Sequence, residues 1–170
     1  MQVREVHTTE YEAAGQVTLA AYRHLPGAHM TDSYAAELVA VDRRAVEAVV
    51  LVAVDDGPNG SILGTVTYVP DPSSPWAEDL RAGEAGIRMM AVSPDAQGRG
   101  VGAALLDACL ARARAQGRDA VFLHSTPWME TAHRLYRRAG FERVPDRDWL
   151  PEPDVPLLAF RLALPPEPAR

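Results

Sequence analysis

The chain has 170 residues, the size of one ordinary domain. Apolar residues make up 47% and charged residues 24%, a balance that excludes a largely disordered chain. The net charge is −6 and aromatic residues amount to 6%, so a general nucleic-acid binder is not expected.

The single cysteine, Cys109, cannot form an internal disulfide, which favours a reducing, cytoplasmic location. It lies in an apolar helical stripe, where a small buried hydrophobic side chain is expected and not a nucleophile. The N-terminus lacks the pattern of a signal peptide, and no apolar run is long enough for a membrane span. His7, His24 and His29 have no metal-binding spacing, so no metal site is expected.

The first half of the chain predicts a strand, two helices and a β-hairpin. Apolar residues at helical spacing mark the helices, and β-branched runs mark the strands. Thr31 or Asp32 is the expected N-cap of the second helix, and Trp76 is expected near the tip of a proline-rich loop. The elements are a strand at 2–7, helices at 9–24 and 32–43, strands at 49–54 and 62–69 around a turn at 57–60, and the loop at 70–83.

The second half alternates strands with helices. Thr126 is the expected cap of the last helix, with Pro127 in its first turn and Gly140 just after its end. The elements are a strand at 86–92, a helix to about 117, a strand at 119–124, the last helix, a strand from 141, and a strand at 154–164. A β-hairpin followed by alternating strands and helices predicts an α/β fold with a mixed, mostly antiparallel sheet flanked by helices. One domain is expected over residues 1–164, with a disordered tail at 165–170.

The stretch Gln97-Gly98-Arg99-Gly100-Val101-Gly102-Ala103 carries the chemistry. It follows a strand and opens a helix, and its glycines allow a sharp turn and close approach to a ligand. Free N–H groups and the positive end of the helix dipole suit an anion, usually phosphate, and Arg99 adds a mobile positive charge. A P-loop would require Lys and Ser or Thr after the last glycine, where Ala103 and Ala104 stand. The Gly-x-Gly-x-Gly spacing also fits the Rossmann fingerprint poorly.

The pattern Gln-x-x-Gly-x-Gly-Ala, after a strand ending in Ala-Val-Ser-Pro, resembles the acetyl-CoA pyrophosphate loop of the GNAT superfamily of N-acetyltransferases. Residues 132–141 (AHRLYRRAGF) resemble the Ala-x-x-Leu-Tyr-x-x-x-Gly-Phe helix that closes the family's cofactor groove. The two matches span about residues 84–144. The resemblance implies a GNAT-like fold and transfer of an acetyl group from acetyl-CoA to a primary amine. The acceptor would be a small molecule or a protein N-terminus that attacks directly in a ternary complex.

The resemblance also implies roles for individual residues. Loop amides would hold the cofactor pyrophosphate, and the strand Met89–Val92 would pair with the pantetheine arm. Tyr136 would lie near the thioester sulfur and protonate the leaving thiolate. The implied cofactor-binding residues are Met90, Ala91, Val92, Gln97, Gly98, Arg99, Gly100, Val101, Gly102 and Ala103.

The chain departs from the family where many members carry a Glu that serves as general base. That position is Gly86 here. Glu84 lies two residues earlier, on the same strand face. It is a candidate base that would act directly or through water, and the alternative is a solvated carboxylate at a loop edge. His124 and His133, the latter expected to be exposed, are further candidate proton carriers.

The missing Glu leaves two alternatives open: a non-catalytic acyl-CoA-binding or sensing module, and a nucleotide-binding regulatory domain. Homodimers are common in the family, so a second copy of the chain is a candidate partner. Nucleic acid and membranes are not expected as partners.

Overall fold

The computed structural model describes residues 1–27, 30–57 and 60–165. His29, two residues of the predicted turn at 57–60 and residues 166–170 lie outside the described residues. The domain boundary at 164 and the disordered tail at 165–170 therefore stay predictions.

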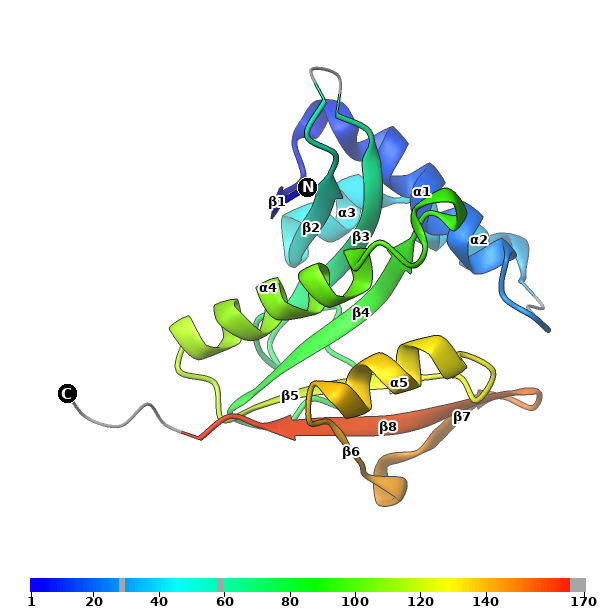
Figure 1. Cartoon of the computed structure of the whole chain (residues 1–170). Helices are drawn as coiled ribbons and strands as arrows, with labels where there is room; N and C mark the ends of the chain where they lie inside the picture. The colour runs from blue at the N-terminus through cyan, green and yellow to red at the C-terminus, as the bar shows by residue number, and fades with distance from the viewer. Residues whose placement is uncertain (28–29, 58–59, 166–170) are drawn as a thin grey trace.

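An eight-stranded sheet organises the chain (Figure 1). Its strand order is β1-β2-β3-β4-β5-β8-β6, and β7 pairs with β8. The β4–β5 pair is parallel and the others are antiparallel, including the predicted β2–β3 hairpin. This arrangement confirms the mixed, mostly antiparallel α/β fold. The strands are β1 (Gln2–Glu5), β2 (Val49–Val54), β3 (Ile62–Val69), β4 (Glu84–Val92), β5 (Ala120–Ser125), β6 (Glu142–Arg143), β7 (Trp149–Glu152) and β8 (Val155–Ala163).

Helices cover both faces of the sheet. The helices α1 and α3 pack on one face, and α4 and α5 on the other (Figure 1). The elements are α1 (Tyr11–Arg23), α2 (Asp32–Val39), α3 (Val41–Glu47), α4 (Val101–Ala115), α5 (Glu130–Arg138), and the short 3₁₀ helices η1 (Thr8–Glu10), η2 (Pro94–Ala96) and η3 (Pro145–Arg147).

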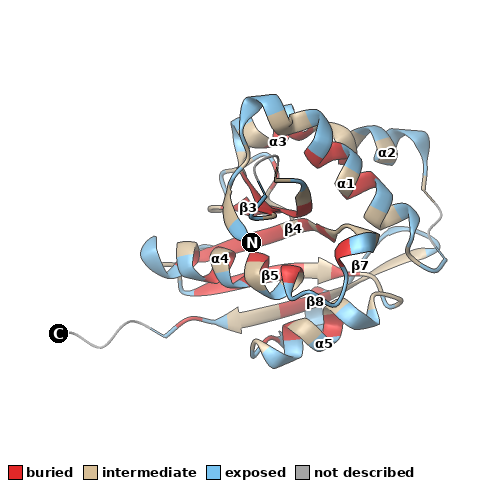
Figure 2. Cartoon of the chain, turned by 45° about the horizontal axis from the view of Figure 1, so that its top comes forward, coloured by how far each residue is buried: buried red, intermediate tan, exposed pale blue. Residues whose placement is uncertain are grey.

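The two faces bury alternate residues of each central strand, as the period of two in a strand requires. On β2, Leu51 belongs to the cluster that includes Leu105 and Cys109 of α4, whereas Val50 packs with Ala14 and Val41 under α1 and α3. Figure 2 shows buried residues along β4, β5 and the sheet-facing side of α1, with exposed residues on the outer sides of the helices. The core therefore has two layers, one on each side of the sheet.

Three sequence predictions differ from the structure. The helix predicted at 32–43 breaks at Ala40, where the Arg44 guanidinium donates to the carbonyls of Glu37 (3.0 Å) and Leu38 (2.9 Å) at the end of α2. The last helix begins at Glu130, because Thr126 makes no cap hydrogen bond among the described residues. The β7 strand was not predicted, since its residues are all exposed and lack alternation. Thr31 caps α2 as expected, through a bond from the Tyr34 N–H.

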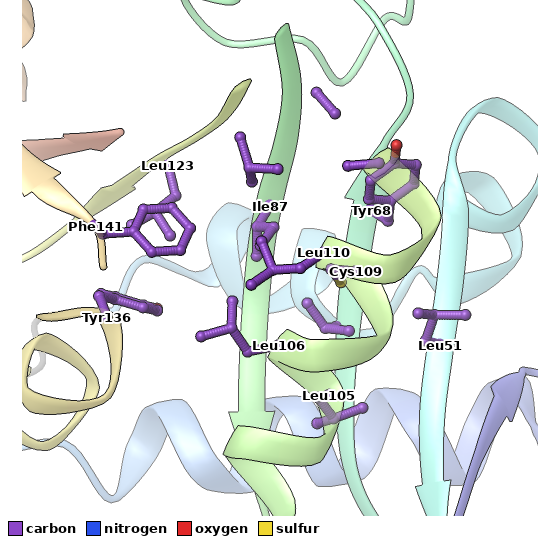
Figure 3. Packing of buried hydrophobic residues seen from close by; sticks show 14 of the residues in the cluster. Leu51, Tyr68, Ile87, Leu105, Leu106, Cys109, Leu110, Leu123, Tyr136 and Phe141 are labelled. Carbon is purple, nitrogen blue, oxygen red and sulfur yellow. The ribbon is translucent and has the colours of Figure 1, made fainter. Parts of the chain in front are cut away.

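Cys109 is fully buried in α4, and burial raises the pKa of its thiol to about 12 (Figure 3). Because the thiolate is the nucleophile that attacks an alkylating reagent, we expect the native protein to resist alkylation at neutral pH and the denatured protein to react at once. Mass spectrometry after iodoacetamide treatment, with and without guanidinium, measures this. Rapid modification of the folded chain would contradict the packing of α4.

Candidate functional site

The strands β4 and β5 separate after a short stretch of pairing. Their register covers Glu84–Gly86 against Ala120–Phe122, after which β5 stays paired with β8 while β4 runs on to Val92 beside β3 (Figure 1). Beyond Gly86, the edge of β4 that faces this gap therefore carries backbone N–H and C=O groups without a strand partner among the described residues. Such an edge can pair with an extended ligand.

A β-bulge lies in β4 beside the gap. Thr65 of β3 pairs with Ala91 and Thr67 pairs with Arg88, so Met89 and Met90 together oppose one residue of β3. The φ angle of Met89 is +50°, in the left-handed region that a side chain rarely adopts. Bulges redirect the backbone and are frequent beside active sites. Here the bulge bends β4 where it leaves β5.

The glycine loop precedes α4 at the far end of β4. Gly98 and Gly100 have φ angles of +76° and +79°, and beyond their chain neighbours no atom of a described residue lies within 4 Å of a Cβ placed on either. Gln97 to Gly100 are exposed, and the first helical bond runs from the Ala104 N–H to the Gly100 carbonyl at 3.0 Å. The N–H groups of residues 101–103 are therefore free of helical partners and suit an anion. The exposed Arg99 pairs with Asp55 at 3.2 Å.

The structure brings the predicted loop, strand and helix together. A Cβ on Gly102 would lie 3.3 Å from Leu135 Cδ2 of α5 and 3.6 Å from Val92 Cγ2 of β4. Tyr136 of α5 is 4% exposed and packs against Phe141 and Phe160 with ring centroids 5.7 and 5.8 Å away. In Figure 3 its side chain extends from α5 toward the strand that carries Ile87. Burial raises the pKa of Tyr136 well above its usual value, so the hydroxyl keeps its proton at neutral pH.

A cavity of about 110 Å³ opens between β4 and β5. The first half of the chain closes it with the aromatic side chains of Tyr22, Tyr34 and Trp76 and the carboxylate of Glu78. Trp76 is thus buried against the cavity, at 6% exposure, and does not stand at a loop tip as predicted. The strand residues lining the cavity are Val69, Gly86, Ile87, Arg88, Met89, Phe122, Leu123, His124, Ser125 and Leu157.

A model of the acetyltransferase (GNAT) family matches residues 9–141. The chain belongs to this family. A GNAT-family acetyltransferase from Staphylococcus aureus Mu50 superimposes with a TM-score of 0.75 at 16% identity, over 96% of this chain and 99% of its own. The protein yncA of Salmonella typhimurium, solved with acetyl-CoA, gives a TM-score of 0.68 at 20% identity, over 100% and 97% of the two chains.

A mycothiol acetyltransferase of Cellulomonas flavigena is 38% identical over 87 residues. The match covers 51% of this GNAT chain and 25% of that protein, so the chain spans about a quarter of the relative's length.

Glu84 of this GNAT-family chain is neither solvated nor among the residues that line the cavity. It is 3% exposed, and its carboxylate accepts bonds from Arg147 Nη1 (2.9 Å) and Nη2 (3.0 Å) and from Arg161 Nε (2.9 Å). Burial alone would raise its pKa, but the bonds from Arg147, the Arg81 N–H and Arg161 hold the pKa below its usual value. The expected solvated carboxylate is therefore wrong, and a low-pKa group held by two guanidiniums does not suit a general base.

Sequence reasoning missed Arg147, which ties η3 to the start of β4. Its side chain is 3% exposed, bonds Asp79 as well as Glu84, and lies 3.5 Å over the ring of Phe122. No periodicity or motif marks such a residue. His133, predicted to be exposed, is 6% exposed, with its Nε2 3.1 Å from Ser125 Oγ.

Within residues 1–27, 30–57 and 60–165, no three His, Cys, Asp or Glu side chains converge as metal ligands. Among the same residues, no helix is long and apolar enough to cross a bilayer.

Proposed function

We propose that this chain transfers an acetyl group from acetyl-CoA to a primary amine by direct attack in a ternary complex. The observation that carries the proposal is the cavity in the gap between β4 and β5. The glycine loop and Tyr136 lie on the α4 and α5 side of the sheet, and polar cavity walls lie on the α1 and α2 side. A thioester reaching through the gap from one side would meet an acceptor from the other.

Acetyl-CoA would bind along the edge of β4. Its pyrophosphate would accept bonds from the free N–H groups of Gly98 to Ala103, as an anion does at a helix N-terminus. Its pantetheine amides would pair with the open backbone edge of Met90, Ala91 and Val92, in the manner of an added strand. The presence of acetyl-CoA in the similar yncA structure supports this arrangement.

Tyr136 would serve as the general acid. A neutral phenol held in a buried position can donate its proton to the sulfur as the C–S bond breaks. Cys109 has a raised pKa inside the core, which supports direct transfer without an acyl-enzyme. A cytoplasmic location fits this free, buried cysteine. Association with a second copy of this chain stays a prediction.

The acceptor screen uses acetyl-CoA with a panel of primary amines: spermidine, an aminoglycoside, a cysteine-containing amino sugar and a peptide with N-terminal alanine. Thiol release and the mass of the acetylated product are the readouts. We expect one class of amine to be acetylated with a thiol released for each acetyl group. Tight acetyl-CoA binding without turnover on any amine would favour the acyl-CoA-sensing alternative.

A further inference from the structure

His124 lines the cavity from β5, and its side chain is 6% exposed. Its Nε2 atom lies 2.8 Å from the backbone carbonyl oxygen of Arg147. A carbonyl oxygen only accepts hydrogen bonds, so Nε2 must carry a proton and donate it. In a neutral ring the other nitrogen, Nδ1, is then the one with the free lone pair.

The Nδ1 atom faces the carboxylate of Glu78, with Oε1 at 3.7 Å. This distance is too long for a direct hydrogen bond. In the neutral ring both atoms are acceptors, and Glu78 and His124 both line the cavity. Two acceptors beside one space suit a ligand with several N–H donors, and an alkylammonium group has three.

We propose that the ammonium group of the acceptor binds against Glu78 and His124, and that His124 Nδ1 is the general base. This inference rests on the proposed acetyl transfer and names the base that Gly86 and Glu84 do not supply. Glu78 and Asp148 are the described carboxylates near His124. Arg88, paired with Glu78 at 2.9 Å, and Arg147 are the nearby cations.

The sheet places the base and the acid on opposite faces. Along β5, Leu123 belongs to the same core cluster as Tyr136, whereas Phe122 lies on the other face under Arg147. His124 shares the face of Phe122, because side chains two residues apart in a strand point the same way. A thioester in the gap would therefore be attacked from the His124 side and lose its thiolate on the Tyr136 side.

Nδ1 takes one proton from the ammonium group, and the amine lone pair forms the C–N bond at the thioester carbonyl carbon. The tetrahedral intermediate collapses with cleavage of the C–S bond, and Tyr136 donates its proton to the leaving sulfur. The nitrogen loses its second proton as the amide forms, which restores the Tyr136 hydroxyl. The imidazolium then releases its proton to water, so the net products are the amide, CoA thiol and one proton.

The protonation state of His124 tests the inference without any acceptor. Long-range ¹H–¹⁵N NMR of the ¹⁵N-labelled protein at neutral pH, with the His124→Gln variant for assignment, distinguishes the ring forms. We expect a neutral ring with the proton on Nε2. A doubly protonated ring would mean a resting ion pair with Glu78, and a proton on Nδ1 would remove the lone pair; either result overturns the inference.

Kinetics with the amine found in the screen give the second test. Gln at position 124 keeps a donor for the Arg147 carbonyl and removes the base, so we expect kcat to fall about 100-fold or more, with the KM for acetyl-CoA unchanged. The rate of this variant should rise with pH as the free amine itself forms. His24→Gln, an exposed position, is the control. An unchanged kcat in the His124 variant would overturn the base assignment.

If the folded wild type binds acetyl-CoA but acetylates no amine in the screen, the acetyl-transfer proposal fails and the NMR measurement still decides the ring form.

Discussion

Replacing Glu84 with alanine is expected to lower the free energy of unfolding by about 3–5 kcal/mol. The variant leaves the guanidinium of Arg147 behind in a buried place. The Arg147 side chain is 3% exposed, and among the described residues Asp79 is its one other carboxylate partner. Removing one member of a buried ion pair costs far more than removing an exposed one. Urea denaturation followed by circular dichroism measures the difference.

Glu152→Ala is the matched control, because Glu152 is exposed on β7. We expect it to change the free energy of unfolding by less than about 0.5 kcal/mol. Equal stability of the Glu84 and Glu152 variants would contradict the ion-pair network around Arg147.

The same network predicts an acid dependence of stability. The pKa of Glu84 is lower in the folded chain than its unfolded value of 4.5. A lowered folded pKa gives stability that is fully present above pH 4.5 and is lost as the pH falls through the folded value. The Glu84→Gln variant lacks this contribution of the Glu84 carboxylate, so its free energy of unfolding should change less than that of the wild type as the pH falls below 5. Parallel curves for the two proteins would show that folding does not lower the pKa of Glu84.

Replacing Tyr136 with phenylalanine is expected to lower kcat about 100-fold or more. The ring contacts with Phe141 and Phe160 are kept. The variant should therefore fold and bind acetyl-CoA as the wild type does. The loss would come from the missing proton for the departing thiolate. Thiol release under saturating substrates, with the thermal unfolding midpoint measured beside it, separates the two effects.

Tyr68→Phe is the matched control for Tyr136. Tyr68 is also fully buried in the α4 core, and its hydroxyl donates to Gln116 Oε1 at 2.7 Å. We expect this variant to lose about 1 kcal/mol of stability and to keep its kcat. Full activity of the Tyr136 variant would assign the proton donation to another group or to water.

Local sequence patterns predict most of the fold and the residues on the proposed acetyl-CoA side of the site. The glycine loop, the β2–β3 hairpin and the apolar stripe of α4 each depend on residues close together in the sequence, so spacing and periodicity predict them. The family resemblance then placed Tyr136 beside the loop, and the packing of Gly102 against Leu135 agrees with that placement.

The acceptor side depends on pairs that are distant in sequence. Arg147 and Glu84 are 63 positions apart, and the bond from His124 to the Arg147 carbonyl spans 23. Nothing in the periodicity of either segment reports such contacts. The break between α2 and α3 likewise depends on Arg44 turning back to the carbonyls of α2. Long-range polar pairing thus explains both the unexpected helix end and the burial of Glu84 among guanidinium groups.

In the proposed function, the loop before α4 binds the pyrophosphate of acetyl-CoA. Isothermal titration of acetyl-CoA into the wild type, Gly100→Asn and Gly100→Asp tests it most directly. Both variants place a side chain of the same shape in open space at a φ angle of +79°, which Asn and Asp tolerate best. They differ in one negative charge, which would repel the pyrophosphate.

We predict that the wild type binds, that the Asn variant binds somewhat more weakly, and that the Asp variant loses on the order of 100-fold in affinity. Equal affinities of the Asn and Asp variants, or no binding to the folded wild type, would contradict the assignment of this loop to the cofactor.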